Sequence, residues 1–247
     1  SADGHASAQL NKLLAAIGST MRINDDEVYD PVNNGGQFYR LYPSVFNKDS
    51  RWTSGIVTSD DNPDNYQTYS QYSGCSVNPG NGTWLVKGFD TTYSVDSDKD
   101  GEGNTSEVET DDSYGYNIVV PRGEVVFLAS EDTAYGGTVF AAGGVFLSDF
   151  EVKAELDNIW DLPYANRTIA ENILDSIQKQ LPLSTIAQMR AGNYNDVFRI
   201  QGYATAGRIE GNAFFDAMYI QDETGGITVF PIAEEGLKIG TKMEIVG

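Results

Sequence analysis

The sequence predicts an α/β domain followed by a small module of short strands. Three continuous apolar runs, at residues 116–120, 124–130 and 138–142, lack the alternation of half-exposed strands, and glycine-containing turns separate them. Such runs are typical of strands buried on both faces, as in a sheet that helices cover. After Pro182 the pattern changes to short strand-like segments divided by Gly-Asn and Gly-Gly turns, which indicates a separate β module.

Length and composition bound the organisation of the chain. Its 247 residues, 40% of them hydrophobic, are enough for one large domain or two ordinary ones. We place the boundary at Pro182, between a first domain of residues 1–181 and a second of residues 182–247. No stretch approaches the roughly 18 apolar residues of a membrane span, and the first residues show no signal segment. If the protein is exported, we expect that its signal has been removed.

The formal net charge of −20 excludes some partners. Affinity for nucleic-acid backbones comes from Lys and Arg side chains, so a protein this acidic is not expected to coat nucleic acid. Such acidity is common in secreted and cell-surface proteins, where calcium is available at about millimolar concentration. The single cysteine, Cys75, excludes an internal disulfide.

The first domain is expected to begin with a helix over residues 8–19, whose apolar residues recur at helical spacing up to Gly18. Residues 22–93 are rich in Asn, Asp, Gly, Ser and Tyr, with short strand-like pieces at residues 39–42 and 84–87. Long irregular stretches of this kind often carry function. The apolar residues of the predicted first helix are Leu10, Leu13, Leu14 and Ile17.

A second helix is predicted over residues 168–181, where Thr168 and Glu171 have the spacing of a capping box. The second domain is expected to open with a short helix over residues 184–191 and to continue as a set of strands. The predicted strands cover residues 198–205, 214–221, 227–230 and 243–246.

The clearest chemical signal is a calcium loop at residues 96–107, which fill the template D-x-[DN]-x-[DN]-G-x5-E without a gap. Calcium takes six to eight oxygen ligands, and the template supplies them from fixed loop positions. Gly101 falls where the loop must turn sharply. The predicted ligands are Asp96, Asp98, Asp100, the Glu102 backbone carbonyl, Asn104 and Glu107.

The surroundings of this loop differ from a helix-loop-helix sensor. Gly103 replaces the branched aliphatic residue that pairs two such loops, residues 91–95 are β-branched and aromatic, and residues 108–116 are acidic and contain glycine. We therefore expect a solitary structural site between a strand and an irregular segment. The alternative is a solvated acidic turn without metal. Nine acidic residues and one lysine between Asp90 and Asp112 favour a cation that offsets their repulsion.

Residues 219–227, Tyr-Ile-Gln-Asp-Glu-Thr-Gly-Gly-Ile, resemble the OB-fold modules of large secreted Gram-positive proteins, among them nucleases, phosphoesterases and proteases. In these modules a segment similar to residues 238–247 forms the fourth strand, and a fifth follows. The resemblance implies that the second domain is an incomplete small β-barrel with its last strand missing. An unclosed barrel exposes a strand edge, so we expect the chain to belong to a longer protein.

The first domain is similar, more loosely, to a glutamine-amidotransferase-like α/β domain of large bacterial surface proteins. Residues 10–28, 137–143 and 146–151 carry this resemblance. It implies a partial doubly wound sheet whose N-terminal part is missing.

The favoured function is a non-catalytic, calcium-stabilised accessory or binding region of a secreted or cell-surface multidomain protein. Its expected partners are calcium, the remaining domains of the parent chain, and carbohydrate or protein on a tyrosine-rich surface. The residues named for that surface are Tyr66, Tyr69, Tyr72, Tyr114 and Tyr116.

Two alternatives remain open. An amidotransferase-like hydrolase would use Cys75 with the single histidine, His5, although a free cysteine is more often a small buried hydrophobe. A nucleic-acid-binding OB module would stack bases on its aromatic residues. No residue is assigned a catalytic role.

Two minor groups complete the candidates. The acidic residues 25–27 with Asp30 could hold a second metal, although a solvated turn is the preferred interpretation. Residues 148–151, Ser-Asp-Phe-Glu, could be a catalytic remnant, although entry into a helix or strand is preferred.

Overall fold

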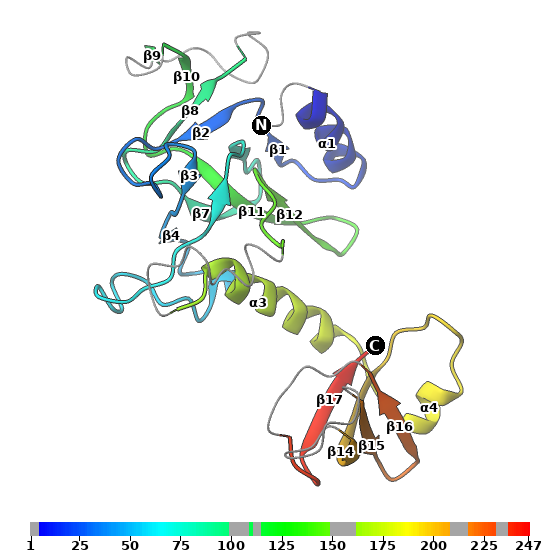
Figure 1. The fold of residues 1–247 in the computed structure, drawn as a ribbon. Helices are drawn as coiled ribbons and strands as arrows, with labels where there is room; N and C mark the ends of the chain where they lie inside the picture. Colours follow the sequence, from blue (N-terminus) through cyan, green and yellow to red (C-terminus); the bar gives the residue numbers. More distant parts are fainter. Residues whose placement is uncertain (1–4, 99–108, 111–114, 149–161, 208–216, 231–236) are drawn as a thin grey trace. The chain divides into compact units, whose positions relative to one another are not determined.

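The structure is a computed structural model that describes residues 5–98, 109–110, 115–148, 162–207, 217–230 and 237–247 (Figure 1). The chain divides into two compact units, Ser1–Ile173 and Leu174–Gly247. The division falls within the long helix α3, Ala165–Gln180, rather than at Pro182. Both units consist of small sheets with few helices, an architecture of the α/β class.

The central sheet of the first unit has the strand order β12-β11-β7-β4, and all its pairs are antiparallel. Its longest strand, β11, comes from the second predicted apolar run, and β12 has the predicted bounds. The strands are β4 (Val45–Phe46), β7 (Thr83–Lys87), β11 (Val126–Asp132) and β12 (Thr138–Ala142).

Strand β11 is buried on both faces, as its apolar run predicts. On one face Phe127 and Leu128 join a core with Trp52, Tyr69 and the first turns of α3. On the other face Val126 and Ala129 pack in a second core. Irregular pairing with β7 accompanies this change of face. The second core also contains Met21, Val77 and Ala141.

The described strands of the first unit differ from the predicted doubly wound sheet, because every pair among them is antiparallel. The reason lies in the connections. Parallel neighbours need a crossover of about a dozen residues or more, whereas residues 133–137 alone join β11 to β12. Glycine turns between apolar runs therefore indicate hairpins here.

A second sheet has the order β2-β8-β10-β9 and encloses a small core of Tyr29, Tyr93, Val95 and Ile118. Two short antiparallel pairs, β1-β6 and β3-β5, and the 3-10 helix η1 (Arg51–Thr53) complete the strand regions. The sheet strands are β2 (Glu27–Tyr29), β8 (Tyr93–Asp96), β9 (Glu109–Thr110) and β10 (Asn117–Val120). The paired strands are β1 (Arg22–Ile23), β3 (Arg40–Leu41), β5 (Gln71–Tyr72) and β6 (Val77–Asn78).

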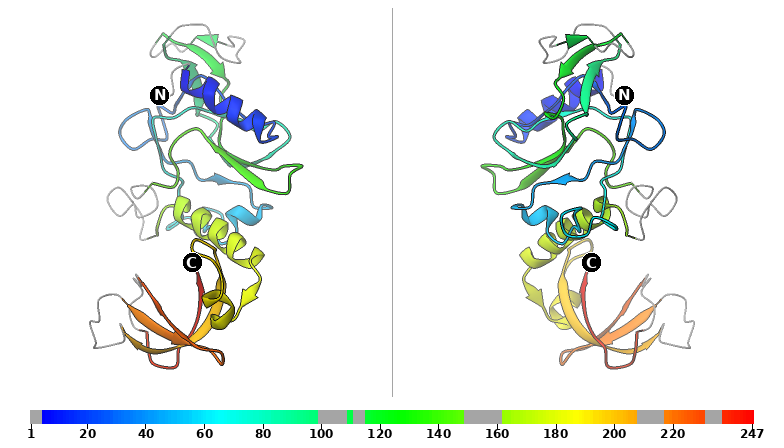
Figure 2. Two further views of the ribbon diagram at one scale, coloured as in Figure 1. Left: turned by 90° about the vertical axis from the view of Figure 1, so that its right-hand side faces the viewer. Right: turned by 90° about the vertical axis from the view of Figure 1, so that its left-hand side faces the viewer.

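Helix α1, His5–Ala16, confirms the first predicted helix but starts and ends earlier. Leu14 packs against Ile23, Cys75 and Val139, and Figure 2 shows the helix (blue) beside the β11–β12 hairpin (green). The other three residues of the predicted apolar stripe are exposed by more than a third of their surface: Leu10, Leu13 and Ile17.

Helix α3 begins three residues before Thr168, so the predicted capping box at Thr168 is wrong. The Thr168 hydroxyl instead accepts a hydrogen bond from Gln67 Nε2 at 2.9 Å. Buried Asn166 exchanges two hydrogen bonds with the backbone of Ser70. The helix start is therefore fixed by contacts distant in sequence, which a local capping pattern does not reveal.

The second unit is a curled half-barrel sheet. Strands β14, β15 and β16 form an antiparallel meander, and β17 returns to pair with β14. The small core contains Ile186, Ile200, Met218 and Ile220. The elements are β13 (Leu183–Ser184), α4 (Ile186–Arg190), β14 (Arg199–Gly207), β15 (Met218–Gln221), β16 (Gly226–Val229) and β17 (Lys242–Val246). None of the helices in the described ranges combines the length and hydropathy needed to cross a bilayer.

The β15–β16 turn holds the start of α4. The Asp222 carboxylate accepts hydrogen bonds from Ile186 N at 2.8 Å and from the backbone of Thr224 and Gly225. The Thr224 hydroxyl accepts another from Ala187 N at 3.0 Å. The hydrogen bond from Ile186, with those within the turn, keeps the pKa of Asp222 below its ordinary value. Asp222 and Thr224, in the string that resembles OB modules, thus have a structural role here.

The backbone of Gly143 lies close to that of Cys75, and this contact offers a test of the packing beside the central sheet. Gly143 N donates to Phe127 O and Gly143 O accepts from Cys75 N, and a Cβ at Gly143 would overlap the Cys75 carbonyl oxygen. We expect Gly143→Ala to lower the free energy of unfolding by about 3 kcal/mol, because overlap with backbone is not relieved by side-chain rotation. Urea denaturation measures the change.

Gly137→Ala is the matched control, because nothing lies within 4 Å of a Cβ at Gly137. We expect this variant to stay within about 0.5 kcal/mol of the parent protein. Equal losses in the two variants would contradict the close approach of Gly143 to Cys75.

Candidate functional site

The predicted calcium loop starts from an ordered strand. Asp96 ends β8, is 7% exposed and lies opposite Asn117 of β10. The strand predicted before the loop is therefore confirmed, and the segment after it contains the short strand β9. Of the predicted ligands the structure describes Asp96 and the exposed Asp98. The other four lie outside the described residues: Asp100, Glu102, Asn104 and Glu107.

Strand pairing fixes both ends of the loop region. Asp96 of β8 and Thr110 of β9 both lie opposite Asn117, on the two sides of β10. Neighbouring strands are about 4.8 Å apart, so these two residues are roughly 10 Å from each other. Within the described residues no group of three or more His, Cys, Asp or Glu side chains is placed to hold a metal.

Two acidic side chains of the group at residues 25–30 are buried rather than solvated. Asp30 is 1% exposed, and its carboxylate accepts hydrogen bonds from the backbone of Val32 and Asn33. The hydroxyls of Thr91 and Thr92 also donate to it, at 2.9 and 2.7 Å. Asp30 therefore ties the end of β2 to the residues that enter β8, and the preferred solvated turn is wrong for this residue.

Asp26 is the second buried carboxyl, and it accepts hydrogen bonds from the Ser76 backbone and hydroxyl. Burial raises the pKa of Asp26 above its ordinary value, and the hydrogen bonds from Ser76 and Ser94 oppose that rise only in part. The Ser76 hydroxyl also accepts from Asn24 Nδ2 at 2.7 Å. These hydrogen bonds fasten the segment between β1 and β2 to Ser76, the residue directly before β6.

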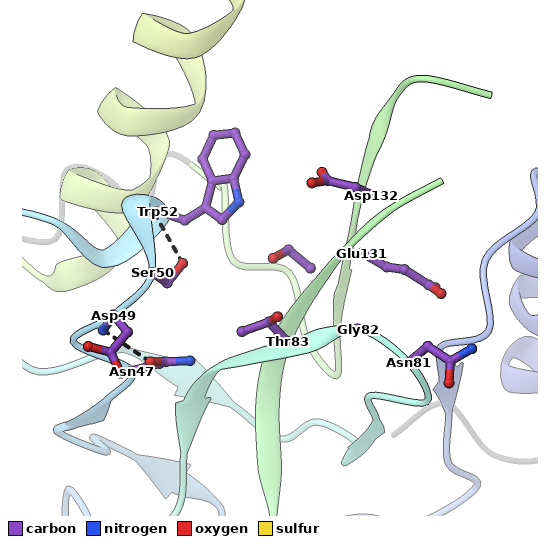
Figure 3. A pocket seen from close by; sticks show the side chains of 10 residues that line it. Asn47, Asp49, Ser50, Trp52, Asn81, Gly82, Thr83, Glu131 and Asp132 are labelled. Atoms are coloured by element: carbon purple, nitrogen blue, oxygen red, sulfur yellow. Dashed lines mark hydrogen bonds between the residues drawn. The ribbon is translucent and has the colours of Figure 1, made fainter. Parts of the chain in front are cut away.

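A polar cavity of about 690 Å³ lies at the end of the central sheet, where β7 begins and β11 ends (Figure 3). Three segments distant in sequence form its wall, since β4, β7 and β11 are neighbours in the sheet. Figure 3 shows Glu131 turned to the side of β11 away from Trp52 and Asp132 turned to the side of β11 that faces Trp52. The lining residues are Asn47, Asp49, Ser50, Trp52, Asn81, Gly82, Thr83, Ser130, Glu131 and Asp132.

The Glu131 carboxylate accepts its hydrogen bonds from residues 19–21, which connect α1 to β1. Its carboxylate accepts hydrogen bonds at 2.7 Å from the Ser19 hydroxyl, the Thr20 hydroxyl and the Thr20 backbone, and a longer one from Met21 N. Partial burial opposes the charged form, but these hydrogen bonds outweigh it and hold the pKa of Glu131 below its ordinary value. Glu131 is therefore a structural tie at the margin of the cavity.

Cys75 is fully buried and takes part in no disulfide. Its side chain packs with Leu14, Ile23 and Val139, which is the environment of a small buried hydrophobe. The side chain of His5 lies outside the described part. Residue Ser148 is described, whereas residues 149–151 are not.

The tyrosines of the proposed surface separate into different environments. Tyr69 is 0% exposed and belongs to the main core, so its assignment to a surface is wrong. Tyr72 is 58% exposed, while Tyr66 and Tyr116 are half-buried. Tyr114 lies outside the described residues. Residues 67–71 are all buried whereas Tyr72 is exposed, a difference that composition does not show.

Sequence reasoning named none of the cavity residues as a site. One signal was present, because the apolar run of β11 ends in three polar residues, 130–132. No protein-family model, curated protein or solved structure matches this chain. The assignment of function therefore depends on the residues themselves.

The hydrogen bonds of Asp30 predict a large effect on stability. We expect Asp30→Ala to lower the free energy of unfolding by roughly 2–4 kcal/mol, because buried donors lose their acceptor. Asp64→Ala removes a carboxylate that is exposed, and we expect a change within about 0.5 kcal/mol. Urea denaturation of both variants measures the difference, and a near-zero effect at Asp30 contradicts its role as a tie.

The lowered pKa of Glu131 predicts a pH dependence. The stability that Glu131 adds is complete above its unfolded pKa near 4.5 and is lost as the pH falls through the lower folded value. Glu131→Gln should therefore reduce the loss of stability between about pH 5 and pH 3. Denaturation at several pH values measures this slope. An unchanged slope would show that Glu131 has the same pKa folded and unfolded.

Proposed function

We propose that this chain is a non-catalytic, calcium-stabilised binding region of a secreted or cell-surface multidomain protein. One observation carries the proposal: residues 96–107 fill the calcium template without a gap. The first ligand position, Asp96, ends a buried strand. A ligand held by a paired strand loses little freedom when an ion binds, which favours binding.

The distance between the two strand ends also supports an ion in this loop. Asp96 and Thr110 lie roughly 10 Å apart across β10, whereas the chain between them could span about 40 Å when extended. The segment is therefore long enough to surround an ion while both ends stay in the sheet. Calcium would then link β8 and β9 across β10 as a structural staple.

The charge distribution supports the same conclusion. Nine carboxylates between Asp90 and Asp112 face a single lysine in the sequence, and an ion of charge +2 lowers their mutual repulsion. Calcium at about millimolar concentration outside the cell suits a weak site of this kind. Secretion is proposed on this ground and on the net charge.

A non-catalytic role is preferred because the described residues give little support to cysteine chemistry. The Cys75 side chain packs among Leu14, Ile23 and Val139, away from solvent. A nucleophile must be reached by its substrate and activated by a nearby base. The alternative of a Cys-dependent, amidotransferase-like hydrolase therefore ranks below the binding role.

The likeness of the second unit to an OB module remains a proposal. Its support is the meander β14-β15-β16 with β17 returning to β14, which suits an open small barrel. Tyr203 is 53% exposed on this sheet, but Glu223 and Asp222 line the adjoining cavity with Lys242. This balance of charge disfavours nucleic acid. Antiparallel pairing likewise disfavours an amidotransferase-like first unit.

A thermal melt with calcium and with chelator tests the staple. Calcium that binds only the folded protein adds about 2.7 kcal/mol at a free concentration near 100 times the Kd, so the Tm must rise. We expect Asp98→Asn combined with Glu107→Gln to abolish the rise, because two ligand charges are lost.

Glu223→Gln is the matched control, since it neutralises an exposed carboxylate outside the loop and should retain the calcium response. Calorimetric titration should give one bound ion per chain. Equal melting temperatures in calcium and in chelator would contradict the proposal that calcium stabilises the fold at this loop.

A further inference from the structure

The polar cavity of the first unit is lined by two largely buried residues whose side-chain polar atoms have no hydrogen-bond partner in the part of the chain described. Ser130 is 6% exposed and Trp52 is 7% exposed, and both line the cavity. No hydrogen bond is formed by Ser130 Oγ or Trp52 Nε1 among the described residues. Neither atom is among the fully buried polar atoms that lack a partner in the described chain, so both can be reached from the cavity by water or by a ligand.

The Trp52 ring itself belongs to the core, and only its nitrogen edge is available to the cavity. Phe140 packs edge-on against the ring at 4.9 Å between centroids, and the Arg51 guanidinium lies 4.2 Å from the ring centroid. Figure 3 shows the indole nitrogen on the edge of the ring nearest β11. Trp52 thus offers a directed hydrogen-bond donor.

Acceptors stand beside this donor. Asp132 receives one hydrogen bond, from the Thr138 hydroxyl to Oδ1 at 2.6 Å, so Oδ2 is available. Asp49 is exposed at the opposite wall. Asn47 is already occupied, because its Nδ2 donates to Trp84 O and its Oδ1 accepts from the Asp49 backbone. The groups open to a ligand are therefore the indole N–H, the hydroxyls of Ser130 and Thr83, the Asn81 amide and carboxylate oxygens.

This set of groups selects the chemistry of the ligand. Three carboxylates and no basic side chain line the cavity, so an anion is repelled. The indole N–H can only donate, so a simple cation leaves it unpaired. A hydroxyl group both donates to Asp132 and accepts from Trp52. The cavity volume of about 690 Å³ falls within the usual range for small-molecule sites.

We propose that this cavity binds a neutral polyhydroxylated ligand, a saccharide unit. The ligand hydroxyls accept from Trp52 Nε1, exchange a hydrogen bond with Ser130 Oγ and donate to Asp132. The site lies on the sheet β12-β11-β7-β4 and does not require calcium in the loop after β8. It deepens the proposed function by naming the ligand class of the binding region, and its test stands even if calcium does not bind.

Nuclear magnetic resonance of 15N-labelled protein tests the proposal at the site. The chain has three tryptophans, and Trp52→Phe identifies the Trp52 indole signal. The probes are the methyl glycosides of glucose, galactose, mannose and N-acetylglucosamine, and glucuronic acid as the charged analogue. We expect at least one neutral glycoside to shift this signal, with a Kd of about millimolar, and glucuronic acid to bind more weakly.

Ser130→Ala supplies the decisive variant. Its hydroxyl has no partner among the described residues, so the Tm should be unchanged while the affinity for the glycoside falls about tenfold, roughly one hydrogen bond. Ser54→Ala makes the same chemical change at an exposed position outside the cavity and should leave affinity unchanged. The proposal is overturned if no neutral probe shifts the Trp52 signal, if glucuronic acid binds as tightly, or if Ser130→Ala binds normally.

Discussion

Burial of β11 on both faces is the constraint on which the first unit depends. Phe127 and Leu128 supply one core and Val126 and Ala129 the other, so a single strand orders the chain on both of its sides. Apolar burial is the main favourable term in folding, and here it fixes the register of β7 and β12. The polar residues that end β11 are then carried to the rim of the sheet, with Ser130 and Glu131 on opposite faces. The packing of β11 in the core thereby positions Glu131 to hold the α1–β1 connection and Ser130 to line the cavity.

Carboxylates with several hydrogen-bond donors order the long irregular segment that precedes this strand. Backbone N–H groups outside helices and strands still need acceptors, and Asp30 and Glu131 supply them to turns that have no ladder partner. Asp222 does the same for the turn and helix start of the second unit. The high acidic content of the chain is therefore partly architectural. A carboxylate with several donors is stabilised in its charged form, as the lowered pKa values of Glu131 and Asp222 indicate.

The sequence predicted what depends on local pattern. The bounds of β12, the strand before Asp96 and the positions of α3 and α4 follow from apolar runs and helical spacing. It did not predict the start of α3, because Asn166 and Thr168 are fixed by residues 96 and 101 positions away. The sequence did not predict the cavity for the same reason, since the walls of the cavity come from segments that only strand pairing brings together. Composition also placed Tyr69 on the surface, whereas it is fully buried in the main core.

Whether a carboxylate serves the fold or a ligand depends on how many donors the protein already gives it. Asp30 and Glu131 each accept at least four hydrogen bonds, so neither has capacity for a ligand. Asp132 accepts one and stands near two polar groups that lack partners within the described chain. Asp96, in contrast, ends β8 in the other sheet, β2-β8-β10-β9, and the predicted calcium loop follows it. Sites that share no contacts couple weakly, so an ion at the loop would aid a ligand in the cavity only by raising the folded fraction.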